Sequence, residues 1–229
     1  MTKPDISLFF PAYNEEGNIE RVVLEAKSIL EELARNFEII IVNDGSNDDT
    51  GKIADALAAQ DPRIKVCHHP LNRGYGAALK TGYTAARLEY IFFVDSDGQF
   101  DLSEMHKFMP FIADFDIVTG YRIRRQDNFV RILNARGWNI INKILFGINV
   151  KDINCAFKCI KRSVFDLFTL TTDGAMINAE LYAKARIHEL TIKEIGVSHY
   201  SRTIGTQTGA HLSVIIKAFR ELWLIKKHL

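Results

Sequence analysis

Residues 38–46 have the sequence EIIIVNDGS, in which four consecutive β-branched side chains, Ile39 to Val42, stop at a polar turn. β-Branched residues favour a strand, and the absence of polar alternation predicts that this strand is covered on both faces. Strands of that kind belong to parallel sheets whose two faces carry helices. Similar apolar runs that stop at Pro or Asp occur at residues 6–10 and 90–94.

Segments with helical spacing of apolar residues separate these runs. Residues 16–35 and 74–88 form two such segments, and Asp48 or Asp49 is placed to cap a third. A short strand at 64–67 completes the alternating order of strands and helices. This order predicts a doubly wound, mostly parallel, Rossmann-like α/β sheet with helices on both faces. Ligands of such sheets bind beyond the carboxyl ends of the strands.

The second half of the chain is less regular. Strands are expected at residues 116–119, 156–160 and 191–197, and helices at 129–146, around 179–185 and at 211–229. No internal repeat or low-complexity linker divides the chain. We therefore expect one domain, residues 1–210, followed by an amphipathic C-terminal helix, residues 211–229.

The composition disfavours several classes of function. A chain of 229 residues with a net charge of +1 has no overall basic field, so nucleic acid is not expected as a partner. The three cysteines are too few for a disulfide framework and indicate a reducing compartment, with Cys155 and Cys159 in the core. No secretory leader is apparent, and no apolar run approaches the roughly 18 to 20 residues that span a bilayer. A cytoplasmic protein, free or on a membrane surface, is expected.

Polar residues follow three of the predicted strands. They are Tyr13-Asn14-Glu15, Asn43-Asp44-Gly45 and Asp95-Ser96-Asp97. The carboxyl ends of parallel strands meet at one edge of a sheet, so these loops are expected to form one acidic rim. Any single loop of this kind can merely cap the next helix, but three together favour a ligand site.

The strongest local signal is Asp95-Ser96-Asp97-Gly98-Gln99, directly after a buried strand. Two carboxylates one residue apart point to the same side, and the Gln99 amide adds a neutral oxygen at the same alternation. Hard oxygen ligands suit Mg²⁺ or Mn²⁺, which proteins commonly share with substrate phosphates. Asp95, Asp97 and Gln99 are therefore predicted to hold a metal that neutralises a diphosphate leaving group.

A dinucleotide-binding fingerprint is the competing interpretation of the glycines at Gly74 and Gly76. Asp95 lies about 20 residues further on, as that fingerprint requires. However, Leu79 occupies the position of the third glycine, and residues 68–73 separate the strand from the glycines. The fingerprint needs a tight strand-to-helix turn, so NAD binding is disfavoured.

Four motifs in order resemble those of family 2 glycosyltransferases with the GT-A fold. They are Pro11-Ala12-Tyr13-Asn14-Glu15, Asn43-Asp44-Gly45-Ser46, Asn72-Arg73-Gly74-Tyr75-Gly76-Ala77-Ala78 and Asp95-Ser96-Asp97-Gly98-Gln99. Within that family the chain is most similar to dolichyl- and polyprenyl-phosphate sugar synthases. The resemblance covers nearly the whole chain.

The resemblance implies a role for each matching residue. The residues implied in donor binding are Pro11, Ala12, Tyr13, Glu15, Val42, Asp44, Asp95, Ser96 and Arg202. Asp95, Asp97, Arg122 and Glu180 are implied at the catalytic centre, and Arg122 and Arg131 at the acceptor phosphate. Guanidinium groups suit phosphate because they stay charged and donate two parallel hydrogen bonds.

Departures from the family pattern leave the donor open. Thr208 stands where the mannose synthases have a lysine, so GDP-mannose is not assumed. Cys155-Ala156 replaces a Gly-Ser pair of the family. The Gln-x-x-Arg-Trp motif of the polysaccharide synthases is absent from the sequence, which argues against a processive enzyme. A donor linked to UDP or GDP is expected.

The role of Glu180 stays open between three interpretations. It could be a general base or a residue that positions others, or it could pair with Lys184 one helical turn later. A phosphate acceptor is already anionic and needs no base, which favours positioning.

The resemblance and two basic amphipathic segments, 129–146 and 211–229, predict an enzyme on a membrane surface. Its expected reaction is the inverting, metal-dependent transfer of a sugar to a polyprenyl phosphate at the cytoplasmic face. One alternative is a soluble family 2 enzyme that glycosylates a hydroxyl group. The other alternative is a non-catalytic protein that binds nucleotide sugars.

Overall fold

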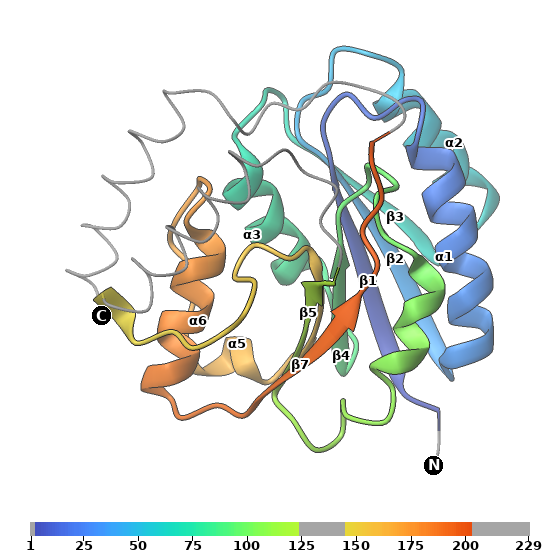
Figure 1. Cartoon of the computed structure of the whole chain (residues 1–229). Coiled ribbons are helices and arrows are strands. Elements are labelled where there is room, and N and C mark those ends of the chain that lie inside the picture. Colours follow the sequence, from blue (N-terminus) through green and yellow to red (C-terminus); the bar gives the residue numbers. More distant parts are fainter. Residues whose placement is uncertain (1–2, 124–144, 203–229) are drawn as a thin grey trace.

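The computed structural model describes residues 3–123 and 145–202, which include a single seven-stranded sheet (Figure 1). The strands are β1 (Asp5–Ala12), β2 (Asn36–Asn43), β3 (Ile64–His68), β4 (Tyr90–Val94), β5 (Ile117–Arg122), β6 (Phe157–Lys161) and β7 (Ile192–Val197). The helices are α1 (Ile19–Leu33), α2 (Thr50–Gln60), α3 (Tyr75–Ala85), the 3₁₀ helix η1 (Leu102–Lys107), α5 (Val164–Leu167) and α6 (Ile177–Ile187).

The strands lie in the order β3-β2-β1-β4-β6-β5-β7. β1 pairs in parallel with β2 and β4, β2 with β3, and β5 with β7, whereas β6 is antiparallel to both β4 and β5. The prediction of a mostly parallel α/β sheet is confirmed. Because β6 reverses direction, β4 and β5 run the same way, and both end at the edge where β1 and β2 end.

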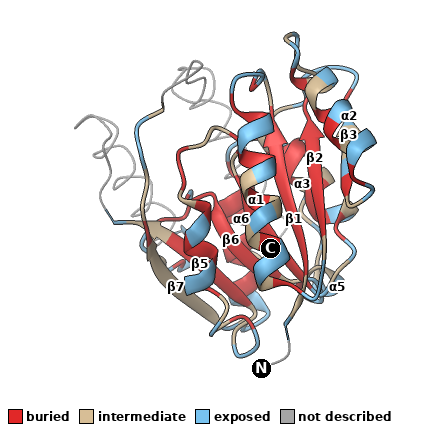
Figure 2. Cartoon of the chain, turned by 90° about the vertical axis from the view of Figure 1, so that its right-hand side faces the viewer, coloured by how far each residue is buried: buried red, intermediate tan, exposed pale blue. Residues whose placement is uncertain are grey.

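Helices cover both faces of the sheet, with α1 and α2 on one face and α3 and α6 on the other (Figure 1). On the first face the Phe92 ring packs against Phe108 and Phe157. On the second face Phe93 stacks on Phe9 and touches Tyr83 of α3. The strands β1, β2, β4 and β6 are buried between these two layers, whereas most residues of the edge strands β3 and β7 are not fully buried (Figure 2).

Most predicted elements are present with shifted ends, and β4 has the predicted bounds. α3 ends three residues before the predicted end. Its chain turns to extended backbone at Ala86, and the amides of Arg87 and Leu88 then bond to the side chains of Glu38 and Ser7. At the start of α2 the residue at the cap is Asp49, but Asp48 accepts the hydrogen bond from the Thr50 amide.

Cys155 and Cys159 lie in the core, as predicted. Among the described residues no helix combines the length and apolar character needed to cross a membrane. The expected helix at 211–229, nearly all of the one at 129–146, and Arg131 within it lie outside the described residues.

Candidate active site

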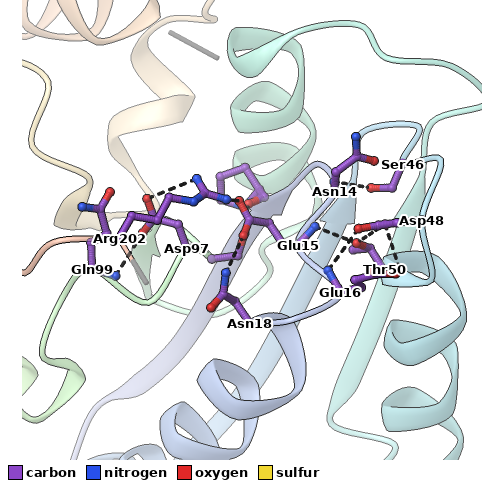
Figure 3. Close-up of polar contacts among 12 residues, drawn as sticks. Asn14, Glu15, Glu16, Asn18, Ser46, Asp48, Thr50, Asp97, Gln99 and Arg202 are labelled. Atoms are coloured by element: carbon purple, nitrogen blue, oxygen red, sulfur yellow. Dashed lines mark hydrogen bonds and ion pairs between the residues drawn. The ribbon is translucent and has the colours of Figure 1, made fainter. Parts of the chain in front are cut away.

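The loops that follow β1 and β2 interlock at the carboxyl edge of the sheet (Figure 3). The amide of Asn14 donates to the Ser46 hydroxyl at 3.0 Å, and the amide of Glu15 donates to Thr50 Oγ1 at 2.8 Å. Asn14 adopts a left-handed conformation, with φ of 56°, and its side chain accepts from the Asn47 amide at 2.9 Å. These bonds hold the Glu15 backbone against the second loop.

Glu15, Asp97 and Arg202 come together from distant parts of the chain (Figure 3). Arg202 Nη2 donates to Glu15 Oε1 at 2.6 Å, and Arg202 Nη1 lies 3.9 Å from Asp97 Oδ2. Asn18 Nδ2 donates to the other oxygen of Glu15 at 2.8 Å. Two residues implied in donor binding, Glu15 and Arg202, and one predicted metal ligand, Asp97, thus form one charged group, called the Glu15–Arg202–Asp97 cluster below.

The carboxylates beside this cluster are crowded. Burial raises the pKa of Asp95, and the neighbouring Asp97 raises it further; burial also raises the pKa of Asp97 and of Glu15. Tyr75 donates its hydroxyl to Asp95 Oδ1 at 3.1 Å. The raised pKa values mean that water and neighbouring groups compensate these carboxylates incompletely when they are ionised. Such a pair favours the arrival of a cation.

Gln99 completes the predicted ligand set. Its Nε2 donates to the Tyr200 carbonyl at 2.7 Å, which leaves the amide oxygen as the group that can serve a cation. Its backbone amide donates to Asp97 Oδ1 at 3.1 Å. Within residues 3–123 and 145–202, no three His, Cys, Asp or Glu side chains gather as a metal site. Two carboxylates and an amide fit Mg²⁺ or Mn²⁺ provided that substrate phosphate supplies further oxygens.

Asp44 organises the start of α3. Its Oδ1 accepts from the Arg73 amide and its Oδ2 from the Gly74 amide, each at 2.9 Å. His69 Nδ1 lies 2.6 Å from Asp44 Oδ1. The next residue, Gly45, has φ of 68°, and a Cβ there would meet the backbone carbon of Leu71 at 2.3 Å. Only glycine fits where these two loops meet.

The other residues predicted to bind the donor differ in exposure. Pro11, Ala12 and Val42 are buried, and Tyr13 is partly exposed. The buried Ser96 donates its hydroxyl to the Pro11 carbonyl at 2.7 Å, so this side chain ties β1 to the loop after β4. Tyr13 is therefore the member of this group whose side chain has room to reach a ligand.

Arg122 has a protein partner that the sequence does not indicate. Its Nε and Nη2 donate to the two oxygens of Asp152 at 2.7 and 2.9 Å. This bidentate geometry fixes the plane of the guanidinium group. Asp152 belongs to a segment that matches the family pattern, but spacing alone does not show that it lies beside the end of β5.

Glu180 is buried in α6 and fully engaged. Its carboxylate accepts from the amides of Thr171 and Thr172 and from the Lys184 ammonium, the last at 2.6 Å. Burial acts to raise the pKa of Glu180, but the hydrogen bonds from Lys184 and Thr172 outweigh it and lower the pKa. A general base needs a higher pKa and a free oxygen. The helical pair with Lys184 is present, and the geometry favours positioning of residues 171–172.

Two further residues at this edge are not identified by the sequence as members of the site. His69 follows β3 and contacts Asp44, and Tyr75 contacts Asp95. The sequence shows that Tyr75 lies in a family motif, but no local pattern marks the single His69. Each contact joins two segments that are separate in the sequence and that the order of the strands brings together.

The fold and the acidic edge are those expected of a glycosyltransferase with the GT-A fold. The model of the family "Glycosyl transferase family 2" matches residues 7–168, most of the chain. The chain therefore belongs to family 2 of the glycosyltransferases.

Three curated relatives support this membership. A glycosyltransferase of Haloferax volcanii is 32% identical over 71% of this chain and 27% of its own length. An undecaprenyl-phosphate 4-deoxy-4-formamido-L-arabinose transferase of Pectobacterium atrosepticum is 26% identical over 92% of this chain and 64% of its own length. A dolichyl-phosphate beta-glucosyltransferase of Trichomonas vaginalis is 30% identical over 84% of this chain and 64% of its own length. The chain thus spans about a quarter to just under two thirds of these relatives.

Solved structures share the fold. Glucosyl-3-phosphoglycerate synthase from Mycobacterium tuberculosis, in complex with phosphoglyceric acid, has a TM-score of 0.71 at 20% identity, covering 97% of this chain and 79% of that one. The same enzyme in complex with Mn²⁺, UDP and phosphoglyceric acid has a TM-score of 0.70 at 19% identity, covering 97% and 77%.

Proposed function

We propose that this enzyme transfers a sugar, with inversion, from a UDP- or GDP-linked donor to a polyprenyl phosphate. The reaction takes place at the cytoplasmic face of a membrane and depends on Mg²⁺ or Mn²⁺. The observation that carries the proposal is the Glu15–Arg202–Asp97 cluster beside Asp95, at the carboxyl edge of the sheet. It combines an excess of carboxylates with a guanidinium group, which suits a metal and a diphosphate together.

Different residues bind the metal, the diphosphate and the nucleoside of the donor. Asp95, Asp97 and Gln99 hold the cation, which when bound neutralises charge on the departing diphosphate. Arg202 donates to the same diphosphate, and its contacts with Glu15 and Asp97 orient its guanidinium group in advance. Tyr13, together with the backbone of the buried strand ends, lines the nucleoside pocket.

Asp44 acts on the donor through its contacts. It holds the amides of Arg73 and Gly74, so it shapes the loop that borders the nucleoside pocket. The Mycobacterium tuberculosis neighbours were crystallised with UDP and with UDP-glucose. UDP-sugars are therefore the first donors to test.

The acceptor is inferred from two lines of support. The relatives of Pectobacterium atrosepticum and Trichomonas vaginalis are named for undecaprenyl phosphate and dolichyl phosphate. In addition, Glu180 is saturated with hydrogen bonds and has a lowered pKa, which suits an anionic acceptor that needs no base. Arg122 and Arg131 are assigned to the acceptor phosphate, and residues 211–229 to the membrane surface.

A transfer assay tests the reaction. The protein is supplied with labelled UDP- or GDP-sugars, Mn²⁺ or Mg²⁺, and vesicles that contain polyprenyl phosphate. We expect label in the lipid extract, together with release of the nucleoside diphosphate. Vesicles without polyprenyl phosphate are the control.

Two results would contradict the proposal. Label that appears only on water-soluble hydroxyl acceptors would replace the lipid acceptor with a soluble one. Donor binding without turnover of any acceptor would make the chain a nucleotide-sugar-binding protein.

A further inference from the structure

Lys158 is a fully buried lysine in the middle of the sheet, with none of its surface exposed. It lies on β6, where its Cα pairs with Phe93 of β4 on one side and with Thr119 of β5 on the other. Directly paired residues share a face of a sheet, so Lys158 lies with Phe93 on the face covered by α3 and α6.

The ammonium group has few partners for a buried charge. Among the described residues it has one hydrogen-bond acceptor, the Cys155 carbonyl. Its Nζ lies 5.4 Å from the centre of the Phe93 ring and 5.8 Å from that of Tyr182. An ammonium group has three donors, and a buried charge without a full set of partners destabilises a fold. Methionine would fill the same space without that penalty.

Two aromatic rings connect Lys158 to Asp95. Phe93, against which the lysine packs, is two residues before Asp95 and touches the ring of Tyr75. Tyr75 in turn donates to Asp95. Asp95 and Asp152 attract the Lys158 ammonium, and Arg122 repels it. Burial lowers the pKa of Lys158 to about 8, so the side chain is charged at neutral pH.

The lysine also fixes the turn that precedes β6. Its ammonium donates to the Cys155 carbonyl, and the Cys155 amide donates to the Asp152 carbonyl at 3.3 Å. The side chain of Asp152 holds Arg122 through two hydrogen bonds. One buried charge is therefore linked to both polar groups that flank the site, to Asp95 through the rings of Phe93 and Tyr75, and to the Asp152–Arg122 pair through Cys155.

We infer that Lys158 is a positioning residue for sugar transfer, whose buried charge holds Asp95 and the Asp152–Arg122 pair in their active arrangement. The inference rests on the proposed function. It adds Lys158, a residue outside the proposed donor-binding set, to the residues on which transfer depends. The charge acts on groups around the leaving diphosphate, so its loss lowers the rate of transfer more than donor binding.

The test compares three variants in the transfer assay and in thermal unfolding. Lys158→Met removes the charge and keeps the volume, and Lys158→Arg keeps the charge. Cys159→Ala, at the next residue and on the opposite face of β6, is the matched control for disturbance of the strand. It creates a small cavity beside Phe92, on the face of the sheet opposite to Lys158.

For Lys158→Met we expect a Tm at or above that of the wild type, because a poorly compensated buried charge is gone. We also expect kcat to fall by roughly 10-fold, with the donor KM changed by less than about 2-fold. Lys158→Arg should regain part of the lost kcat. Cys159→Ala should show the opposite pattern, a lower Tm with kcat unchanged.

Several outcomes overturn the inference. Wild-type kcat in Lys158→Met shows that the charge is not used. A Tm lowered as far as in Cys159→Ala, with activity lost in proportion, assigns Lys158 to packing. If Lys158→Met does not fold, Lys158→Gln is measured in the same way, and unfolding of both variants also assigns Lys158 to packing. An inactive wild-type protein overturns the proposed function along with this inference, whereas an active one matched by Lys158→Met overturns the inference alone.

Discussion

The two edges of the sheet differ in the direction in which the pKa values of their carboxylates are shifted. At the amino edge, where β1, β2, β3 and β5 begin, each acid with a shifted pKa has close partners that lower it. Hydrogen bonds from Arg63 and Lys27 lower the pKa of Asp61, and Arg35 lowers that of Asp5. Glu38 and Asp116 are lowered as well, because hydrogen bonds from Lys65 and Thr191 among others outweigh burial.

At the carboxyl edge the balance is reversed. Burial raises the pKa of Glu15, Asp95 and Asp97, and the hydrogen bonds and cations around them do not compensate fully. Asp48 and Glu180 are exceptions. Hydrogen bonds from Thr50 and Glu16 outweigh the burial of Asp48, those from Lys184 and Thr172 outweigh the burial of Glu180, and both pKa values are lowered. The Asp48 carboxylate bonds to groups of both loops, after β1 and β2, and so has a structural task.

This difference in pKa shifts indicates which carboxylates stabilise the fold and which are candidates for a function. Carboxylates with lowered pKa values stabilise the fold, and carboxylates with raised values destabilise it unless a ligand neutralises them. An edge that collects the second kind is where a cation or a proton is needed. The shifted carboxylates of the amino edge stabilise the fold, and the destabilising carboxylates of the carboxyl edge are those that our proposal assigns to the reaction.

The largest expected effect comes from Asp97→Asn at the carboxyl edge. Transfer should fall by roughly 100-fold or more, because a cation ligand is lost where charge develops. The Tm should not fall, because a crowded negative charge is removed. Asp49→Asn is the control, an exposed acid of the same edge that pairs with Lys52. Initial rates and melting curves check both, and a normal rate in Asp97→Asn would remove Asp97 from the metal site.

Arg202→Gln is expected to have the next largest effect. The change removes the cation that Glu15 and Asp97 share, so kcat/KM for the donor should drop by roughly 10- to 100-fold. Arg35→Gln, which breaks an exposed pair with Asp5 at the amino edge, should leave kcat/KM unchanged. Equal losses in the two variants would erase the contrast between the edges.

For Asp61→Asn we expect the opposite result, a loss of stability without a loss of transfer. Asp61 accepts from Arg63 and lies 2.7 Å from the Lys27 ammonium. Its loss should lower the free energy of unfolding by about 1 to 2 kcal/mol, with transfer unaffected. Chemical denaturation and initial rates measure both. Lost activity at normal stability would mean that the amino edge also serves the reaction.

The smallest effect is a pH dependence with opposite sign at the two edges. In the metal-free protein Asp95 and Asp97 hold protons that the unfolded chain releases above about pH 4, so their contribution lowers stability as pH rises. The stability given by Asp61 is present above about pH 4 and is lost as the pH falls below it.

Unfolding measured at several pH values checks these signs. The free energy of unfolding of Asp97→Asn should fall less than that of the wild type between pH 5 and 8. Asp61→Asn should differ from the wild type in the loss of stability at acidic pH. Parallel curves for Asp97→Asn and the wild type would contradict the raised pKa values.

The sequence predicts the elements of this contrast better than their contacts. The run at 90–94 and the acids after it are placed correctly, because a buried strand and its polar end are local features. The antiparallel insertion of β6 between β4 and β5 is not predicted, because strand order depends on contacts between distant segments. The pairing of Glu15 with Arg202, 187 residues apart, has the same origin.

Lys158 shows a second limit of sequence interpretation. A lysine in a predicted strand is ordinarily assigned to the solvent side, and only the sheet order reveals that both of its neighbouring strands bury it. Likewise, the motif of Arg122 assigns it to phosphate, and its bidentate contact with Asp152 becomes visible only in the fold.

Calorimetric titration of UDP and GDP, with and without Mn²⁺, tests the central claim that the carboxyl edge is the nucleotide and metal site. We expect one of the two nucleotides to bind the wild type and Asp61→Asn with an affinity that Mn²⁺ increases. In Asp97→Asn the increase should be lost. Equal affinity in Asp97→Asn with Mn²⁺ present, or no effect of Mn²⁺ on the wild type, would contradict the account.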